Sequence, residues 1–203
     1  MTSATIALPR ERYKSEVRAQ ILTGARQIFV HEGYASFSLR KLAAQIGYSP
    51  AAIYKHFKSK SEIFDTLAEE SFAALTRASS SVKPIDGEDP VDRLKRGIWA
   101  YVNFGLDNPD DYRFAFLLTP PGADKPPKPR AAYSGLRDRV QKCIEAGRFA
   151  SGDPELMAQS LWAAAHGVTS LLVQKPAFPW VGKRRLITRV IDSAVGGLLF
   201  ENQ

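Results

Sequence analysis

Residues 38–57 constrain the fold more than any other stretch, because they read as two short helices joined by a tight turn. From Leu39 to Ile46 the apolar residues recur at spacings of three and four, which places them on one face of a helix. Gly47 follows where a chain leaving a helix often takes a left-handed conformation. Ser49 and Pro50 then supply a capping hydroxyl and a proline tolerated at the first helical position. The pattern predicts a helix-turn-helix, with an ordinary helical hairpin as the alternative.

The distribution of charge along the chain bears on this choice. The 203 residues carry a net charge of +7. Residues 1–60 hold ten Lys and Arg against three Glu, an excess of seven, whereas the rest hold 18 basic and 18 acidic side chains. Cations concentrated on the helix-turn-helix segment are suited to DNA phosphates. A solvated basic surface without a partner is the alternative.

Further helices are expected on both sides of this unit. A helix from Tyr13 to His31 is expected to brace it, and Ser59 with Glu62 has the spacing of a capping box that begins a fourth helix, reaching about Ser80. Residues 1–58 are therefore predicted to form a three-helix DNA-binding domain. Its predicted core consists of Ile21, Phe29, Leu39, Leu42, Ile46, Ile53 and Phe57.

Residues 59–203 predict a larger helical ligand-binding and dimerisation domain, so the chain is expected to be all-α with about nine helices. Thr119 to Arg130 contains five prolines and predicts a long loop. The last helix, expected from Lys183 to Phe200, has apolar stripes on two faces and needs two partners. We expect one partner to be its own core and the other a second chain, giving a homodimer through the last two helices. A monomer is the alternative. The stripes are Leu186, Val190, Ala194 and Gly197, and Ile187, Ile191, Val195 and Leu199.

Other features exclude several classes of protein. Leu156 to Gln174 is 19 residues without a formal charge, near the length of a membrane span, but its polar side chains favour a buried helix. The one cysteine, Cys143, fits a reducing cytoplasm, and no signal peptide is expected. Three histidines and one cysteine lack the spacing of a metal or nucleophile site, and no glycine-rich phosphate loop occurs. We therefore expect no enzyme, cofactor, metal or membrane association.

The order of these segments resembles the TetR family of transcriptional regulators. In the N-terminal segment the resemblance rests on residues 25–29 (ARQIF), 33–34 (GY), 38–43 (SLRKLA), 47–49 (GYS) and 53–57 (IYKHF), followed by Lys58 and Lys60. In the C-terminal segment, residues 108–112 (NPDDY) and 162–167 (WAAAHG) resemble the WHG-type ligand-binding domain of that family.

The resemblance implies a homodimer that binds double-stranded operator DNA near a promoter and releases it when a small-molecule effector binds, usually as a repressor. Carried over by position, it places one set of side chains against phosphates and another over base edges, in agreement with their chemistry. A half-buried aromatic role for Tyr54 and a solvated role for His56 are the alternatives. The phosphate set is Ser38, Tyr48, Tyr54, His56, Lys58 and Lys60; the base set is Arg40, Ser49, Ala51, Ala52 and Lys55.

An effector site is hypothesised among aromatic residues of the C-terminal segment and His166, although aromatic residues at helical spacing are more often plain core. Two other functions stay open: a helical protein-interaction adaptor with a basic face, and a ligand-binding protein without operator activity. The hypothesised pocket residues are Trp99, Tyr101, Phe104, Tyr112, Phe116, Trp162 and His166.

Overall fold

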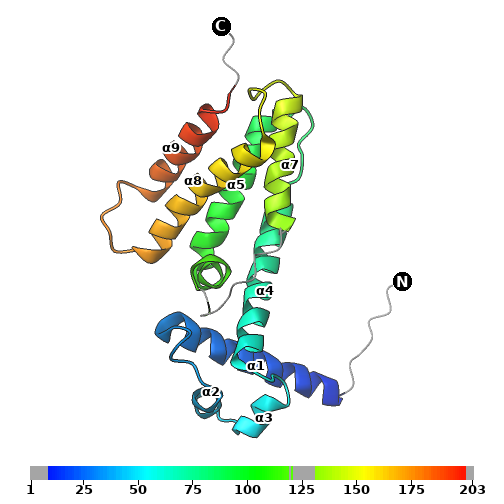
Figure 1. The fold of residues 1–203 in the computed structure, drawn as a ribbon, viewed down its shortest axis with the longest axis vertical. Coiled ribbons are helices and arrows are strands. Elements are labelled where there is room, and N and C mark those ends of the chain that lie inside the picture. Colours follow the sequence, from blue (N-terminus) through cyan, green and yellow to red (C-terminus); the bar gives the residue numbers. More distant parts are fainter. Residues whose placement is uncertain (1–8, 119, 121–130, 200–203) are drawn as a thin grey trace. The chain divides into compact units, whose positions relative to one another are not determined.

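The computed structural model describes residues 9–118, 120 and 131–199 (Figure 1). Over these residues the chain forms nine α-helices, which confirms the predicted all-α fold, and one π-helical turn, Arg113–Leu117. The predicted proline-rich loop lies outside the described residues except for Pro120. The helices are α1 (Pro9–Glu32), α2 (Leu39–Ile46), α3 (Pro50–Tyr54), α4 (Lys60–Ser80), α5 (Pro90–Asp107), α6 (Pro109–Tyr112), α7 (Ala131–Glu145), α8 (Pro154–Gln174) and α9 (Lys183–Gly196).

These residues divide into two compact units, which we call the head and the body. The head consists of residues 9–71, 113–118 and 120, and the body of residues 72–112 and 131–199. Helix α4 begins in the head and ends in the body, and the chain returns to the head after Tyr112. The functional division expected after residue 58 stays a prediction.

The turn between α2 and α3 has the predicted caps. The Ser38 hydroxyl accepts a hydrogen bond from the backbone N–H of Lys41 at 3.1 Å, and the Ser49 hydroxyl accepts one from Ala52 at 3.2 Å. Gly47 ends α2 in the left-handed region with φ of 73°. Each helix end thus finds a local partner for its free backbone groups, which fixes where α2 stops and α3 starts.

Aromatic side chains around Phe29 form the centre of the head core. Phe29 is fully buried, and its ring stacks on Phe37 with centroids 4.3 Å apart. The rings of Phe64 and Phe114 meet it edge-on at 5.3 and 5.9 Å. Phe114 lies in the π-helical turn and was not predicted to join this core. Of the predicted core residues, Ile21, Phe29, Leu42, Ile53 and Phe57 are buried, while Leu39 and Ile46 are partly exposed and pack against the same cluster.

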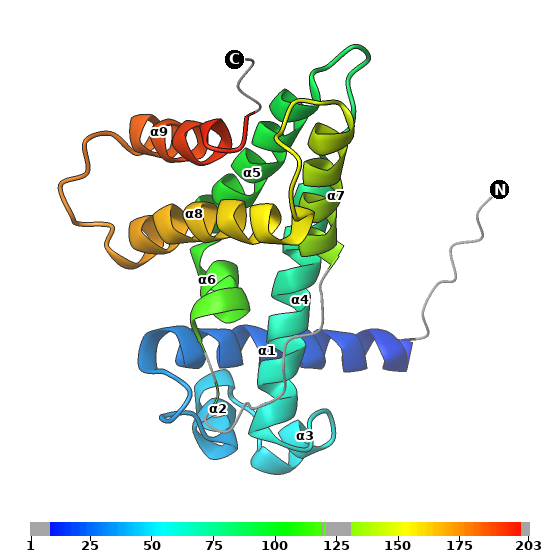
Figure 2. The ribbon, with the colours of Figure 1, turned by 45° about the horizontal axis from the view of Figure 1, so that its top comes forward.

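The body is built from α5, α7, α8 and α9, with α8 packed against the other three (Figure 2). By length and composition α8 is the one described helix that could cross a membrane. Seven of its residues are buried, including Leu161, Ala165 and Val168, which pack with Ile187 and Ile191 of α9. Helix α8 therefore serves as a core helix of the body.

Helix α9 is shorter than the sequence predicted, because it ends at Gly196 rather than continuing to Phe200. Consecutive glycines at 196 and 197 favour a helix end, since glycine loses more conformational freedom in a helix than other residues. The chain beyond them finds backbone partners elsewhere: Leu199 forms an isolated β-bridge with Phe149, and the carbonyl of Leu198 accepts a hydrogen bond at 3.1 Å from Ala150. Leu199, the last residue of one predicted apolar stripe, therefore lies outside the helix, and that stripe ends at Val195.

We expect Gly24→Ala to destabilise the head by about 1–3 kcal/mol, because a Cβ at Gly24 would lie 2.5 Å from Cγ2 of Ile46 and 3.0 Å from Cδ1 of Leu42. This overpacking exceeds the gain of about 0.5–1 kcal/mol that alanine brings to a helix interior. Amide hydrogen exchange of α1 and α2 measures the effect. Gly135→Ala in α7 is the control, because a Cβ at Gly135 would have its nearest neighbour, Nη1 of Arg139, at 3.5 Å. In that variant the protection of the amide hydrogens is expected to be kept or to rise. Unchanged protection in Gly24→Ala would contradict the close packing.

Candidate nucleic-acid interface

Helix α3 presents a polar and cationic surface to solvent because its apolar side is fixed in the head core. Ile53 and Phe57 are fully buried. Ser49 and Lys55 lie on the exposed side, and the Tyr54 side chain is 57% exposed. The half-buried alternative for Tyr54 therefore does not describe the structure. Arg40 and Ser38, at the start of α2, and Ala51 in α3 are also exposed, whereas Ala52 is half-buried.

Two cations from α1 join the predicted set near the end of α3. The guanidinium of Arg18 lies 4.2 Å above the Phe57 ring. Partial burial lowers the pKa of His56, and the charges of Lys14, Arg18 and Lys55 lower it further. Lys14 and Arg18 were missed as candidates, although their spacing of four residues places them on one face of α1. Positive charge therefore surrounds His56 from two helices.

Two predicted phosphate contacts also have partners within the head. The Tyr48 hydroxyl donates to the side-chain oxygen of Gln20 at 2.7 Å. The Lys60 ammonium lies 4.0 Å from the Tyr34 ring centroid and donates to the carbonyl of Phe37 at 3.2 Å. Burial lowers the pKa of Lys60. These contacts hold both side chains in place, so each has a structural role, while its phosphate contact stays a prediction.

The start of α4 has the predicted capping box with one change. The Ser59 hydroxyl accepts from the backbone N–H of Glu62 at 3.1 Å, while the Glu62 carboxylate accepts from the backbone N–H of Lys58 at 2.7 Å. The second bond thus goes to the residue before the cap rather than to the cap itself. It leaves the Lys58 side chain exposed to solvent beside the helix start.

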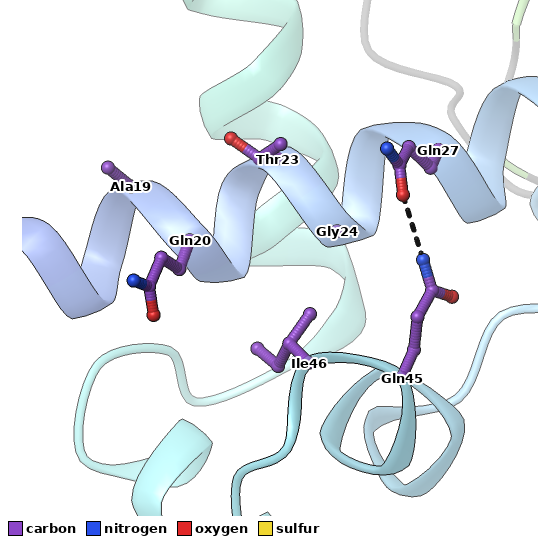
Figure 3. A pocket seen from close by; sticks show the side chains of 7 residues that line it. All are labelled: Ala19, Gln20, Thr23, Gly24, Gln27, Gln45 and Ile46. Atoms are coloured by element: carbon purple, nitrogen blue, oxygen red, sulfur yellow. Dashed lines mark hydrogen bonds between the residues drawn. The ribbon is translucent and has the colours of Figure 1, made fainter.

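A shallow hollow lies on the head between α1 and α2 (Figure 3). Gln45 of α2 donates to the side-chain oxygen of Gln27 in α1 at 3.0 Å, and Ile46 faces Gly24. None of the predicted DNA-contacting residues lines this hollow. Its uncharged lining ties α2 to α1 and positions the turn.

In the body, three of the hypothesised pocket residues form a hydrogen-bonded cluster. The Tyr112 hydroxyl lies 2.7 Å and the Tyr101 hydroxyl 3.1 Å from Nδ1 of His166. Burial raises the pKa of Tyr101 to about 12 and raises that of Tyr112, while it lowers the pKa of His166. All three groups are therefore neutral near pH 7.

The other hypothesised pocket residues are placed differently. Phe104 is buried, Trp99 is half-buried, and Trp162 is 38% exposed with its ring 6.0 Å from that of His166. Phe116 belongs to the head unit and the rest to the body. One hollow lies between α1 and α2 and another lies on α9, and this aromatic set lines neither of them.

Two family models match the chain and together cover more than half of it. Residues 21–67 match bacterial regulatory proteins of the tetR family, and residues 94–194 match the tetracyclin repressor-like C-terminal domain. The chain belongs to the TetR family. It is thus a TetR-family DNA-binding regulator, and the curated relative that it matches over most of its length is a transcriptional activator.

Individual relatives agree with this assignment. The chain is 26% identical to the HTH-type transcriptional activator FasR of Mycolicibacterium smegmatis over 191 residues. This alignment covers 94% of this chain and 81% of FasR. The chain is 32% identical over 102 residues to the nucleoid occlusion factor SlmA of Cronobacter sakazakii, covering 49% of this chain and only 50% of that relative. A solved structure, a bacterial regulatory protein in the tetR family from Rhodococcus RHA1, has the same fold, with a TM-score of 0.72, 22% identity, and coverage of 91% of this chain and 97% of that one.

We expect the DNA affinity of this TetR-family chain to rise as pH falls from about 7.5 to 5.5, with His56 responsible. In the free protein the pKa of His56 lies below the ordinary histidine value of 6.5. A neighbouring phosphate stabilises the protonated form and raises that pKa, so the complex binds more protons than the free protein. Affinity measured by fluorescence anisotropy at constant ionic strength tests this.

His56→Gln is expected to flatten this pH dependence, whereas His31→Gln, which removes an exposed histidine from α1, is expected to leave it. An equal pH dependence in wild type and His56→Gln would contradict the phosphate contact.

Proposed function

We propose that this protein is a homodimeric transcriptional repressor in the cytoplasm that binds a two-fold operator and leaves it when a small molecule binds the body. The observation that carries the proposal is the exposed face of α3, with Tyr54 and Lys55 pointing to solvent and cations of α1 beside it. Such a face has the groups needed to meet a major groove and its phosphates.

Within this proposal the two sets of residues have different tasks. Lys55 and Arg40 carry long cationic side chains that can donate to guanine, and the methyl groups of Ala51 and Ala52 can contact thymine. The remaining groups hold phosphates and set the orientation of the head. Lys14 and Arg18 join this second group, whose other members are Ser38, Tyr48, Tyr54, His56, Lys58 and Lys60.

We expect Lys60→Ala to lower affinity for all DNA and to reduce the slope of log K against log salt by about one unit, because one phosphate contact releases about 0.9 counterion. Lys55→Ala is instead expected to relax preference at particular bases by about 1–3 kcal/mol. DNA fragments retained by the purified protein supply the operator for both measurements. A protein that binds no DNA at low salt would favour the adaptor alternative, and an unchanged slope in Lys60→Ala would reject its phosphate role.

The proposed dimer uses the outer faces of α8 and α9. Leu156 and Leu171 of α8 are 65% and 51% exposed, and Ala163 lies between them on the same helix and is also exposed. On α9 the apolar stripe through Leu186 and Val190 is only partly buried. Apolar side chains that stay exposed along two adjacent helices support a partner surface, and the same faces of two copies form a four-helix contact.

We expect Leu171→Glu to shift the protein from dimer to monomer in light scattering at micromolar concentration and to weaken operator binding. A buried charge facing its own copy across the two-fold axis has no partner and costs several kcal/mol. The control is Ile85→Glu, because Ile85 is similarly exposed, at 59%, but lies in the body outside α8 and α9. Monomeric wild-type protein would reject the interface.

The proposed effector response starts at the Tyr101–Tyr112–His166 cluster. A ligand with a hydroxyl or carbonyl group can exchange hydrogen bonds with these three neutral groups, and the ring of Trp162, 6.0 Å from that of His166, offers apolar contact. Tyr112 is two residues before Phe114, which belongs to the head core. Displacement of Tyr112 therefore pulls on a short segment that ends in the head. A ligand shifts DNA affinity only if it binds the protein with Tyr112 displaced and the protein with Tyr112 in place with different affinities.

The similarity to FasR, a transcriptional activator, favours a second candidate for the sign of regulation. An operator overlapping the promoter, with transcription falling when the protein is added, supports a repressor. An operator upstream, with transcription rising, supports an activator. Release of the retained DNA by members of a small-molecule collection identifies the effector. DNA that is never retained, with small-molecule binding intact, supports the ligand-binding alternative.

A further inference from the structure

Three arginines of the body gather where α5 meets α7. Arg93 and Arg96 lie three residues apart on α5 and so share one face of that helix. Arg139 of α7 lies near both, since their charges act on its guanidinium. This cluster is not apparent from the sequence alone, because residues 61–203 carry no net charge when taken together.

One of these three arginines has a full carboxylate partner. Nε of Arg96 donates to Oε1 of Glu88 at 2.6 Å, and its Nη2 donates to Oε2 of Glu88 at 2.7 Å and to the carbonyl of Lys83 at 2.8 Å. This two-point bond is the strong form of an arginine–carboxylate pair. It uses both oxygens of Glu88, so little of that carboxylate is left for the other two arginines.

The other two arginines are incompletely paired. Arg139 donates through Nη1 to the carbonyl of Gly135 at 3.1 Å and through Nη2 to that of Ser79, in the last turn of α4, at 3.0 Å. Both acceptors are neutral. In the part of the chain that the structure describes, Nε of Arg139 and Nε of Arg93 are both buried and have no hydrogen-bond partner. A buried charged donor without an acceptor is costly, and native proteins rarely keep one without a reason.

A glycine provides the space in which Arg139 lies. A Cβ at Gly97 of α5 would come within 3.2 Å of both Cζ and Nε of Arg139, so the guanidinium rests directly on the backbone of α5. Burial lowers the pKa of Arg139, and the charges of Arg93 and Arg96 lower it further, against a smaller opposing effect of Asp138. The body therefore holds this cation at a place where like charges repel it, and an added anion would relieve that repulsion.

We propose that Arg93, Arg96 and Arg139 form a binding site for the carboxylate or phosphate group of a small anionic ligand. The planar guanidinium offers paired donors that match the oxygens of either group. Arg93 and Arg96 are partly open to solvent, so a ligand can approach their guanidinium groups. The site is separate from the Tyr101–Tyr112–His166 cluster, and its existence does not depend on operator binding.

Thermal unfolding of the full chain in phosphate, in succinate, and in chloride of equal ionic strength tests the site. We expect the melting temperature of wild type to rise by a few degrees in at least one of the two oxyanions at about 10 mM, relative to chloride, as ligand binding to the native state requires. A rise in phosphate but not in succinate indicates a phosphate ligand. A rise in succinate but not in phosphate indicates a carboxylate ligand. Absence of stabilisation by both overturns the proposal.

Substitutions separate this site from phosphate binding by the head. Arg93→Gln is expected to keep the fold, because the Arg93 Nε has no partner to lose, and to abolish the oxyanion-dependent rise. Arg137→Gln, which removes an exposed arginine of α7 close by, is the matched control and is expected to keep the rise. An equal rise in wild type and Arg93→Gln would place the bound anion elsewhere and overturn the proposal.

Two further variants are expected to change affinity in opposite directions in isothermal titration with the stabilising anion. Glu88→Gln removes the carboxylate that competes for Arg96, so binding is expected to tighten several-fold. Gly97→Ala displaces Arg139 from its place on α5, so binding is expected to weaken several-fold. Weaker binding in Glu88→Gln, or unchanged binding in both variants, would contradict the assigned residues.

Discussion

The head depends on the burial of Phe29 among four other aromatic rings. Phe29 contacts the rings of Tyr34 and Phe37 in the link to α2, Phe64 in α4 and Phe114 in the π-helical turn. One side chain thus joins α1 to the link that follows it and to two segments that are far from it in sequence, α4 and the π-helical turn. Helix α3 is only five residues long, which is too short to be stable alone. It is joined to these segments by short connections, so the direction in which Tyr54 and Lys55 point follows from the aromatic cluster rather than from α3 itself.

Features set by neighbouring residues could be read from the sequence, and features set by distant ones could not. Ser38, Gly47 and Ser49 determine the ends of α2 and α3 through contacts within four or five residues, so their prediction was confirmed. The glycines at 196 and 197 mark the end of α9 locally, whereas the path of the chain after them depends on pairing between Leu199 and Phe149, fifty residues apart in sequence. Likewise Phe114 joins the head core from outside the N-terminal segment. No periodicity carries such information, because helical spacing describes one helix at a time.

The same distinction applies to the candidate sites. The exposed side of α3 was predictable because Ile53 and Phe57 identify its buried side. The cations at Lys14 and Arg18 approach His56 only through the packing of α1 against the turn, and therefore escaped a search centred on residues 38–57. The aromatic residues of the body were recognised as a group. Their arrangement as a neutral hydrogen-bonded cluster depends on α5, α6 and α8 coming together.

Net charge misleads in the same way when it is summed over a long segment. The segment after residue 60 is neutral as a whole, yet folding brings Arg93, Arg96 and Arg139 together with one paired carboxylate, Glu88. Electrostatic interactions depend on separations of a few ångströms and fall off within about 10 Å at physiological salt. A neutral total is thus compatible with a strongly positive site. For the head, the excess of charge indicated a polyanion because DNA presents phosphates along its whole length; for the body, local imbalance between three side chains points instead to a single small anion.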